Sequence, residues 1–134
     1  MDLISVERNN DPDASGLEFK VQVRGHAVTS DMAKDAGGDD GGPSPSELFA
    51  GSLGACMAMI VQNHCTRHGY EGDVGVSLTI EYAKNPNRIG RIVADLELPK
   101  GVPEDKIEAI KRLAKRCPIH ATLEQPPALD IDVV

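Results

Sequence analysis

Positive charge is scarce in this chain. Among its 134 residues, Lys and Arg together number 14 while Asp and Glu number 21, which gives a formal net charge of -7. The longest basic tract is the short segment from Lys111 to Arg116. Because proteins bind nucleic acids through basic side chains that neutralise phosphates, we expect no nucleic-acid partner.

Cysteine is also scarce, and the number of cysteines is odd. The three thiols are Cys56, Cys65 and Cys117, which is a poor basis for a framework of disulfides. The first residues, from Met1 to Arg8, lack both the basic leader and the sustained apolar core of a secretory signal. We therefore expect a cytoplasmic protein, in which reduced cysteines are more often buried or reactive than cross-linked.

No apolar segment is long enough to cross a membrane. The longest such run, Leu48 to Val61, has 14 residues, whereas a helix that spans a bilayer needs about 20. Apart from Cys56, its only polar side chain is that of Ser52, so a helix here would be apolar almost all round. The run predicts a buried core helix and no membrane association.

The start and the end of this helix are marked in the sequence. Ser44 can cap the helix, Pro45 suits the first helical position, and Glu47 stands three residues after the cap, as in a capping box. Gly69 is a suitable residue to end it. These signals predict one long helix from Ser44 to Gly69.

The rest of the chain predicts strands before this helix, and strands and helices after it. Period-two alternation predicts strands at 3–7, 17–23 and 26–30, a long hairpin from 74–82 and 92–98, and a last strand at 129–133. Acidic residues at 104 and 105 begin a second helix, which Pro118 interrupts. The glycine-rich segment 35–42 predicts a mobile loop. We expect a single α+β domain over residues 1–134.

Two of the cysteines have contexts that matter for chemistry. Cys117 is expected at the N-cap of the short helix that Pro118 opens, just after four basic residues, and both features favour the reactive thiolate. It could equally end the apolar stripe of the preceding helix as a buried cysteine. Cys56 lies in the apolar helix, where burial raises the pKa of a thiol, and Cys65 has no distinguishing feature.

A metal site is a weaker alternative. His64 and His68 are one helical turn apart, and soft ligands could come from Cys65, Cys117 and His120. None of these residues has the close spacing of a CxxC or HExxH motif. The chain also lacks the Gly-Lys-Ser/Thr of a phosphate cradle and the nucleophile elbow of a serine hydrolase.

Two motifs together resemble a known family. The segment Pro45 to Cys56 ends in Leu-Gly-Ala-Cys, and Cys117-Pro118-Ile119-His120 begins 61 positions after Cys56. Both resemble the osmotically inducible protein C and organic hydroperoxide resistance family (OsmC/Ohr), and Gly25-His26, Ser30-Asp31 and 45–48 are most similar to its OsmC-like redox-protein branch. The resemblance implies an intertwined homodimer with antiparallel sheets around a long buried central helix and with active sites at the subunit interface.

The resemblance also implies a chemistry for the thiols. In this family, Cys56 would attack an organic hydroperoxide and become a sulfenic acid, and Cys117 would resolve it as a disulfide that a dithiol reductant opens. The implied activity is a cysteine-dependent peroxidase in oxidative stress defence, without a metal or an organic cofactor.

The family pairs a glutamate and an arginine with the first cysteine. Ten residues before Cys56, where relatives carry the glutamate, this chain has Ser46, and Glu47 is displaced by one. Because a straight helix separates Glu47 from Cys56 by about 13 Å of rise, Glu47 would act through an arginine or across the dimer, or would only close the capping box. Arg24 is the candidate for the arginine, with Arg8 as the other.

An alternative function follows from the replaced glutamate. The chain could be a non-catalytic dimer that binds a small apolar or thiol-bearing ligand beside Cys56. The rate at which Cys56 reacts with peroxide, compared with that of a free thiol, distinguishes the two hypotheses.

Overall fold

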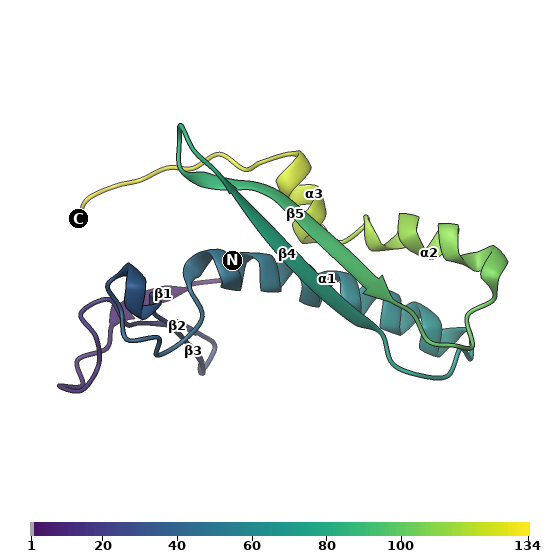
Figure 1. Ribbon diagram of the computed structural model, residues 1–134, viewed down its shortest axis with the longest axis horizontal. Helices are drawn as coiled ribbons and strands as arrows, with labels where there is room; N and C mark the ends of the chain where they lie inside the picture. The colour runs from purple at the N-terminus through teal and green to yellow at the C-terminus, as the bar shows by residue number, and fades with distance from the viewer. Residues whose placement is uncertain (1) are drawn as a thin grey trace. The chain divides into compact units, whose positions relative to one another are not determined.

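A computed structural model of the chain describes residues 2–134 and shows a mixed α and β fold. In chain order, its elements are β1 (Ser5–Arg8), β2 (Phe19–Val23), β3 (His26–Ser30), the 3-10 turn η1 (Lys34–Ala36), α1 (Pro45–Arg67), β4 (Gly75–Ala83), β5 (Arg88–Glu97), the 3-10 turn η2 (Glu104–Lys106), α2 (Ile107–Ala114) and α3 (Pro118–Glu124) (Figure 1). The predicted α+β class is confirmed. The chain divides into two compact units, one ending at Phe49 and the other covering Ala50–Val134, and each is described by itself. That the chain is one domain stays a prediction.

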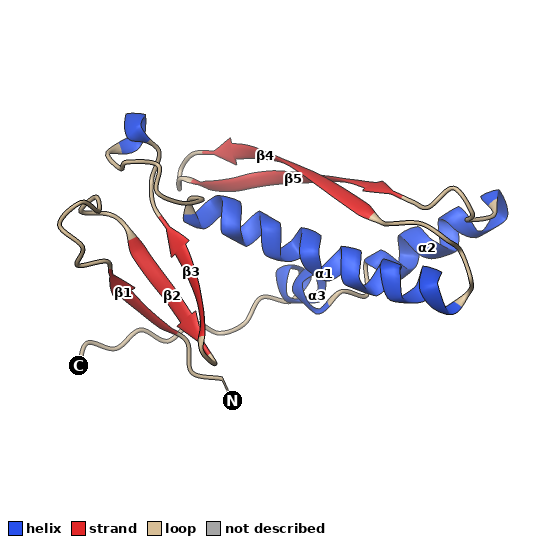
Figure 2. Cartoon of the chain, turned by 90° about the horizontal axis from the view of Figure 1, so that it is seen from below, coloured by secondary structure: helices blue, strands red, loops and turns tan. Residues whose placement is uncertain are grey.

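The three N-terminal strands form the predicted antiparallel meander. β2 pairs with both neighbours, with Val21 opposite Val6 of β1 and opposite Val28 of β3 (Figure 2). The β2–β3 turn places Arg24 and Gly25 at φ of 49° and 80°, where the glycine adopts the left-handed conformation without steric cost.

The segment after β3 is organised around one buried carboxylate. Asp31 is 1% exposed. Its oxygens accept hydrogen bonds from the Ser15 hydroxyl at 2.7 Å and from the backbone amides of Met32, Asp39 and Gly41 at 2.8, 3.2 and 3.0 Å. The expectation that the loop at 35–42 is unpacked is therefore wrong, because a single charged acceptor can satisfy several backbone donors where apolar side chains are missing.

Helix α1 begins and ends as the sequence predicts, with Gly69 following it in the left-handed conformation at φ 72°. One face of α1 is buried through Ala50, Leu53, Gly54, Val61 and Cys65. A Cβ on Gly54 would overlap the side chain of Leu78 in β4, so this glycine allows the helix and the strand to approach closely. The opposite face stays accessible, and Met59 is 71% exposed.

The second unit places the β4–β5 hairpin along α1 (Figure 1). The predicted hairpin is confirmed, with Val76 paired to Leu96 and Ile80 to Ile92. Ile110 and Ala114 of α2 pack with Val61 and Cys65 of α1 into the buried core, and the partly buried residues around them are Met57, Tyr70, Val74, Leu96, Leu98 and Val102. This core fixes α1 and α2 relative to each other within the unit.

The predicted last strand at 129–133 is wrong for the single chain. The segment after α3 runs as a loop (Figure 2). Leu129, Ile131 and Val133 are almost fully exposed, since no strand in residues 2–134 pairs with them. Alternation of apolar and polar residues gives a segment one apolar face, but a β-strand also needs the edge of another strand with which to form hydrogen bonds. None of the described helices is both long and apolar enough to span a membrane.

Replacing Asp31 with Asn should loosen the loop that it organises. The pKa of Asp31 is lowered, first by the Gly41 amide and then by the Ser15 hydroxyl, so its ionised form stabilises the fold. We expect proteolysis within 35–42 to accelerate by about tenfold in the Asp31→Asn variant at pH 7. In the native chain the protection should persist at neutral pH and be lost as the pH falls through the lowered pKa.

Asp39→Asn is the matched control, because it removes the same charge from the same loop. The Asp39 side chain is exposed and accepts no hydrogen bond among the described residues, while its backbone amide still reaches Asp31. Peptide mapping after limited proteolysis should show little change in this control. Equal cleavage in both variants would contradict the role given to Asp31.

Candidate active site

Helix α1 carries Cys56 at the border between its buried and accessible faces. Leu53 and Gly54, just before it, are buried, whereas Ala55 is exposed. Cys56 itself is partly exposed. Cys56 therefore borders the core of the second unit and is not fully enclosed by it.

Cys117 lies at the break between α2 and α3, as predicted. It is the N-cap of α3, with φ -55° and ψ 130°, and its sulfur accepts a hydrogen bond from the backbone amide of His120 at 3.4 Å. Pro118 occupies the first turn of α3 and disfavours helical geometry at the residue before it, which ends the preceding helix. Cys117 is fully buried.

The structure brings Cys56 and Cys117 together. Cys117 is close enough to raise the pKa of the Cys56 thiol, and the backbone amide of Ile119 is close enough to act on it in the opposite direction. All three cysteines of the chain are free thiols. A separation of 61 residues permits this contact without requiring it, so only the packing of α1 against the α2–α3 segment decides it.

The surroundings of Cys56 favour its protonated form. Burial raises the pKa of the Cys56 thiol, and so do the hydrogen bond to Cys117 and any negative charge on that sulfur. The Ile119 amide acts in the opposite direction but is the weaker influence, and the pKa stays above its ordinary value. The groups of the second unit that act on Cys56 therefore favour its thiol over its thiolate.

Cys65 takes no part in this pair. It is fully buried in the core with Val61, Ile110 and Ala114, and burial raises its pKa. It fills space in the core, which agrees with the absence of any distinguishing feature in its sequence context.

Glu47 closes the capping box of α1. Its carboxylate accepts a hydrogen bond from the Ser44 amide at 3.0 Å, while its own amide donates to the Ser44 hydroxyl oxygen at 3.3 Å. These bonds, with the Ser44 amide first, lower the pKa of Glu47. The structural role expected for Glu47 is confirmed, and a catalytic role stays a prediction.

Arg24 lies in the β2–β3 turn, and its side chain is exposed. It lines an open cavity of about 400 Å³ together with Leu3, Gln22 and His26. No ion pair of Arg24 occurs among the described residues. Arg8, at the end of β1, is also exposed. That either arginine activates Cys56 stays a prediction.

The rings of the two histidines of the metal alternative lie close together at an interplanar angle of 31°. The ring centroids of His64 and His68 are 4.1 Å apart, and Nδ1 of His68 lies 2.8 Å from the His64 carbonyl oxygen. Within residues 2–134, no three His, Cys, Asp or Glu side chains are grouped closely enough to hold a metal ion. The geometry gives the metal alternative no ligand set.

Two features of the site were missed from the sequence. One is the Ile119 amide at Cys56, and the other is the approach of His120 Nδ1 to Glu124 Oε1 at 3.5 Å. Pro118 carried a signal for the first, because the amides of a helix's first turn have no partners within the helix. The second is a four-residue spacing along a short helix, which is too common to single out.

Comparison with known proteins assigns this fold to a family. The sequence profile described as OsmC-like protein matches residues 37–132, which include both Cys56 and Cys117. The chain belongs to the OsmC-like family. No curated protein matches it at the level of sequence.

Solved structures of OsmC-like proteins share the fold at low sequence identity. A Psychrobacter arcticus protein, whose name proposes a role in osmotic stress and detoxification, has a TM-score of 0.78 at 18% identity, with 91% of this chain and 88% of that chain covered. An OsmC-like protein from Mycoplasma pneumoniae has a TM-score of 0.73 at 20% identity, with 94% of this chain and 89% of that chain covered. An organic hydroperoxide resistance protein OsmC from Legionella pneumophila has a TM-score of 0.65 at 18% identity, with 92% of this chain and 88% of that chain covered.

The raised pKa of Cys56 predicts slow alkylation at neutral pH. At pH 7, iodoacetamide should modify Cys56 more slowly than it modifies N-acetylcysteine, because less of the thiol is ionised. The rate constant should rise about tenfold per pH unit and continue to rise beyond the ordinary thiol pKa of about 8.5. Mass spectrometry of the Cys56 peptide against pH measures this, and a plateau below pH 7 would contradict it.

Proposed function

We propose that this protein is a cysteine-dependent peroxidase that reduces organic hydroperoxides or related peroxides. The observation that carries the proposal is the contact between a partly exposed thiol, Cys56, and a fully buried one, Cys117. A peroxide can reach the first sulfur, whereas the second is sheltered and positioned to react with what the first becomes. The name of the Legionella relative, an organic hydroperoxide resistance protein, supports the same chemistry.

The proposed cycle needs only the two thiols, the peroxide and a dithiol. The Cys56 thiolate attacks the outer oxygen of ROOH, the O–O bond breaks, and the products are Cys56 sulfenic acid and the alcohol ROH. The sulfur of Cys117 then attacks that of Cys56, so that a disulfide forms and water leaves. A dithiol reductant opens the disulfide by exchange and is itself oxidised.

The local geometry supports this division of roles. When Cys56 ionises, the Ile119 amide is a donor already in place to stabilise the thiolate. Cys117 is held at its N-cap position by the His120 amide, beside the sulfur that it would resolve. Further activation of Cys56 is assigned by family resemblance to Arg24, with Glu47 as its partner. We also place the protein in the cytoplasm, where a reducing environment would keep the thiols free.

We propose further that the active form is a homodimer. On α1, the large apolar side chain of Met59 is 71% exposed, next to the small exposed Ala55. In the C-terminal segment, Ile131 is 92% exposed between Leu129 and Val133, in an alternating pattern that lacks a partner strand among the described residues. Exposed apolar surface of this kind marks interaction sites, and a second copy would cover it.

The second candidate function is binding without catalysis. It would be a dimer that holds a small apolar or thiol-bearing ligand beside Cys56. The raised pKa of Cys56 favours it, because a protonated thiol is a poor nucleophile. Reaction of Cys56 with cumene hydroperoxide no faster than that of N-acetylcysteine would support this candidate over the peroxidase.

The peroxidase proposal predicts a defined oxidation product. One equivalent of cumene hydroperoxide should convert the reduced protein to a Cys56–Cys117 disulfide, detected by peptide mapping. Cys56→Ser should abolish peroxide consumption, while Cys117→Ser should stop at a Cys56 sulfenic acid that dimedone traps.

Cys65→Ser is the matched control for these variants. It replaces a thiol that is buried apart from the pair, so peroxide consumption should be preserved. Unchanged turnover in the Cys56→Ser variant would refute the proposal, and a sulfenic acid at Cys117 in that variant would reverse the two roles.

The dimer proposal predicts that a charge at Met59 separates the subunits. Met59→Glu places a carboxylate on the exposed apolar face of α1, and its burial against a second copy would weaken association by at least about a hundredfold. Sedimentation velocity should show a monomer for this variant and a dimer for the native protein. Lys100→Glu, at an exposed position in the turn after β5, is the control and should remain dimeric. A native protein that sediments as a monomer would refute the dimer.

A further inference from the structure

The second unit contains an open cavity between α1, β5 and α2. Its volume is about 510 Å³, within the range of sites that hold small molecules. Its walls are mostly apolar, with Leu53 and Met57 from α1, Ile92 and Leu96 from β5, and Ile107 from α2. Neither Cys56 nor Cys117 is part of this lining.

Positive charge gathers along one edge of this cavity. Lys111 of α2 and Lys115 just after it both line it, four residues apart and therefore on the same side of the helix. The Lys111 ammonium lies 3.5 Å from Glu108, an exposed pair of small energetic value. Lys115 has no ion pair among the described residues. The other ionisable groups of the lining are His120 and a single acid, Asp95.

An apolar cavity with two lysines at its edge is complementary to a molecule with an apolar chain and one anionic end. We propose that this cavity binds a single-chain amphiphilic carboxylate, with its chain against the apolar walls and its carboxylate at Lys115 and Lys111. Burial of the chain supplies the hydrophobic part of the affinity. Charge-assisted hydrogen bonds from the ammonium groups supply the preference for the anion. The inference goes beyond the proposed peroxidase, because binding of this kind uses neither thiol.

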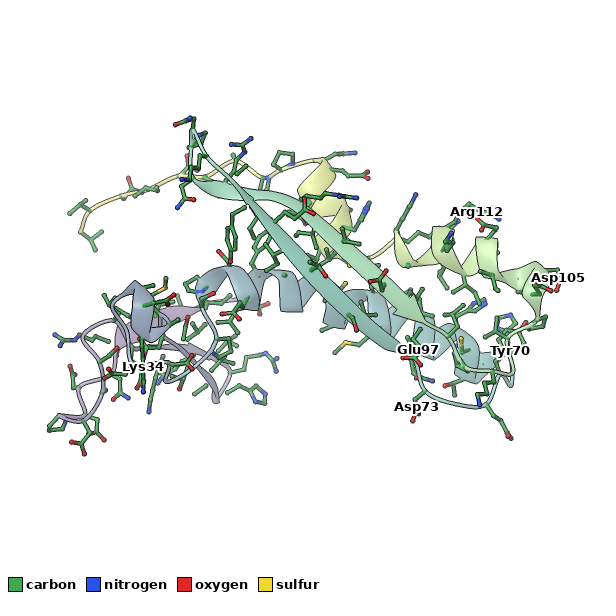
Figure 3. The ribbon with its side chains drawn as sticks, in the orientation of Figure 1. Lys34, Tyr70, Asp73, Glu97, Asp105 and Arg112 are labelled. Atoms are coloured by element: carbon green, nitrogen blue, oxygen red, sulfur yellow. The ribbon has the colours of Figure 1, made fainter. Side chains whose placement is uncertain are left out.

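Arg112 provides a matched comparison for Lys115. It carries the same charge and belongs to the same helix, but it does not line the cavity, and its side chain points away from the β4–β5 hairpin (Figure 3). Replacement of Asp95 should have the opposite effect on anion binding, since Asp95 is the one acidic residue that lines the cavity. All three side chains are exposed, so their replacement leaves the core intact.

The experiment is titration calorimetry of the reduced protein with decanoate and with decan-1-ol, which have equal chain lengths. We expect one decanoate to bind per chain, about tenfold more tightly than decan-1-ol. Lys115→Ala should weaken decanoate binding about fivefold or more and leave decan-1-ol unaffected, while Arg112→Ala should change either affinity by less than about twofold. Asp95→Asn should strengthen decanoate binding.

Three results would overturn the proposal. The first is equal affinity for decanoate and decan-1-ol, which would leave only an apolar cavity. The second is an equal loss in the Lys115→Ala and Arg112→Ala variants, which would assign the effect to overall charge. The third is the absence of saturable decanoate binding. Because decanoate carries no peroxide, its binding should survive in the Cys56→Ser variant, so this proposal and the peroxidase can fail independently.

Discussion

The packing of α1 against the rest of the second unit is the constraint on which the thiol pair depends. Gly54 allows the helix to lie close to β4 at Leu78, and further along the helix Val61 and Cys65 pack with Ile110 and Ala114 of α2. Once α2 is fixed there, the chain has only Lys115 and Arg116 before it reaches Cys117. The proximity of Cys56 and Cys117 thus follows from the packing of α1 against α2.

The surroundings of the thiol pair have opposite effects on disulfide formation and on ionisation of Cys56. Contact between the thiols and their burial make disulfide formation geometrically accessible, yet the same features raise the pKa of Cys56 and disfavour its thiolate. The Ile119 amide offsets this only in part. In the peroxidase that we propose, these surroundings would favour the second step, disulfide formation, and the first step would depend on a further charged group.

Much of the local structure could be predicted because local signals sufficed. The Ser44–Glu47 capping box, the left-handed Gly69 and the Pro118 break each depend on residues within one or two turns, and each prediction is confirmed. Two other predictions were wrong because the structure of those segments depends on residues far away in the sequence or on a partner strand. The loop at 35–42 is ordered by Asp31 and by Ser15, which lies twenty residues before the start of the loop, and the strand at 129–133 lacks a partner edge among residues 2–134.

The sequence by itself determined that a long apolar helix carries Cys56 and that Cys117 caps a short helix, because capping, periodicity and proline geometry act over a few residues. Only the tertiary structure decided that these two thiols lie close together, since proximity across 61 residues depends on how the helices pack. Packing also decided the pKa of Cys56 and the cavity lined by Lys111 and Lys115, because burial is a property of the assembled core. Local sequence signals identified the candidate residues, and tertiary packing determined their surroundings.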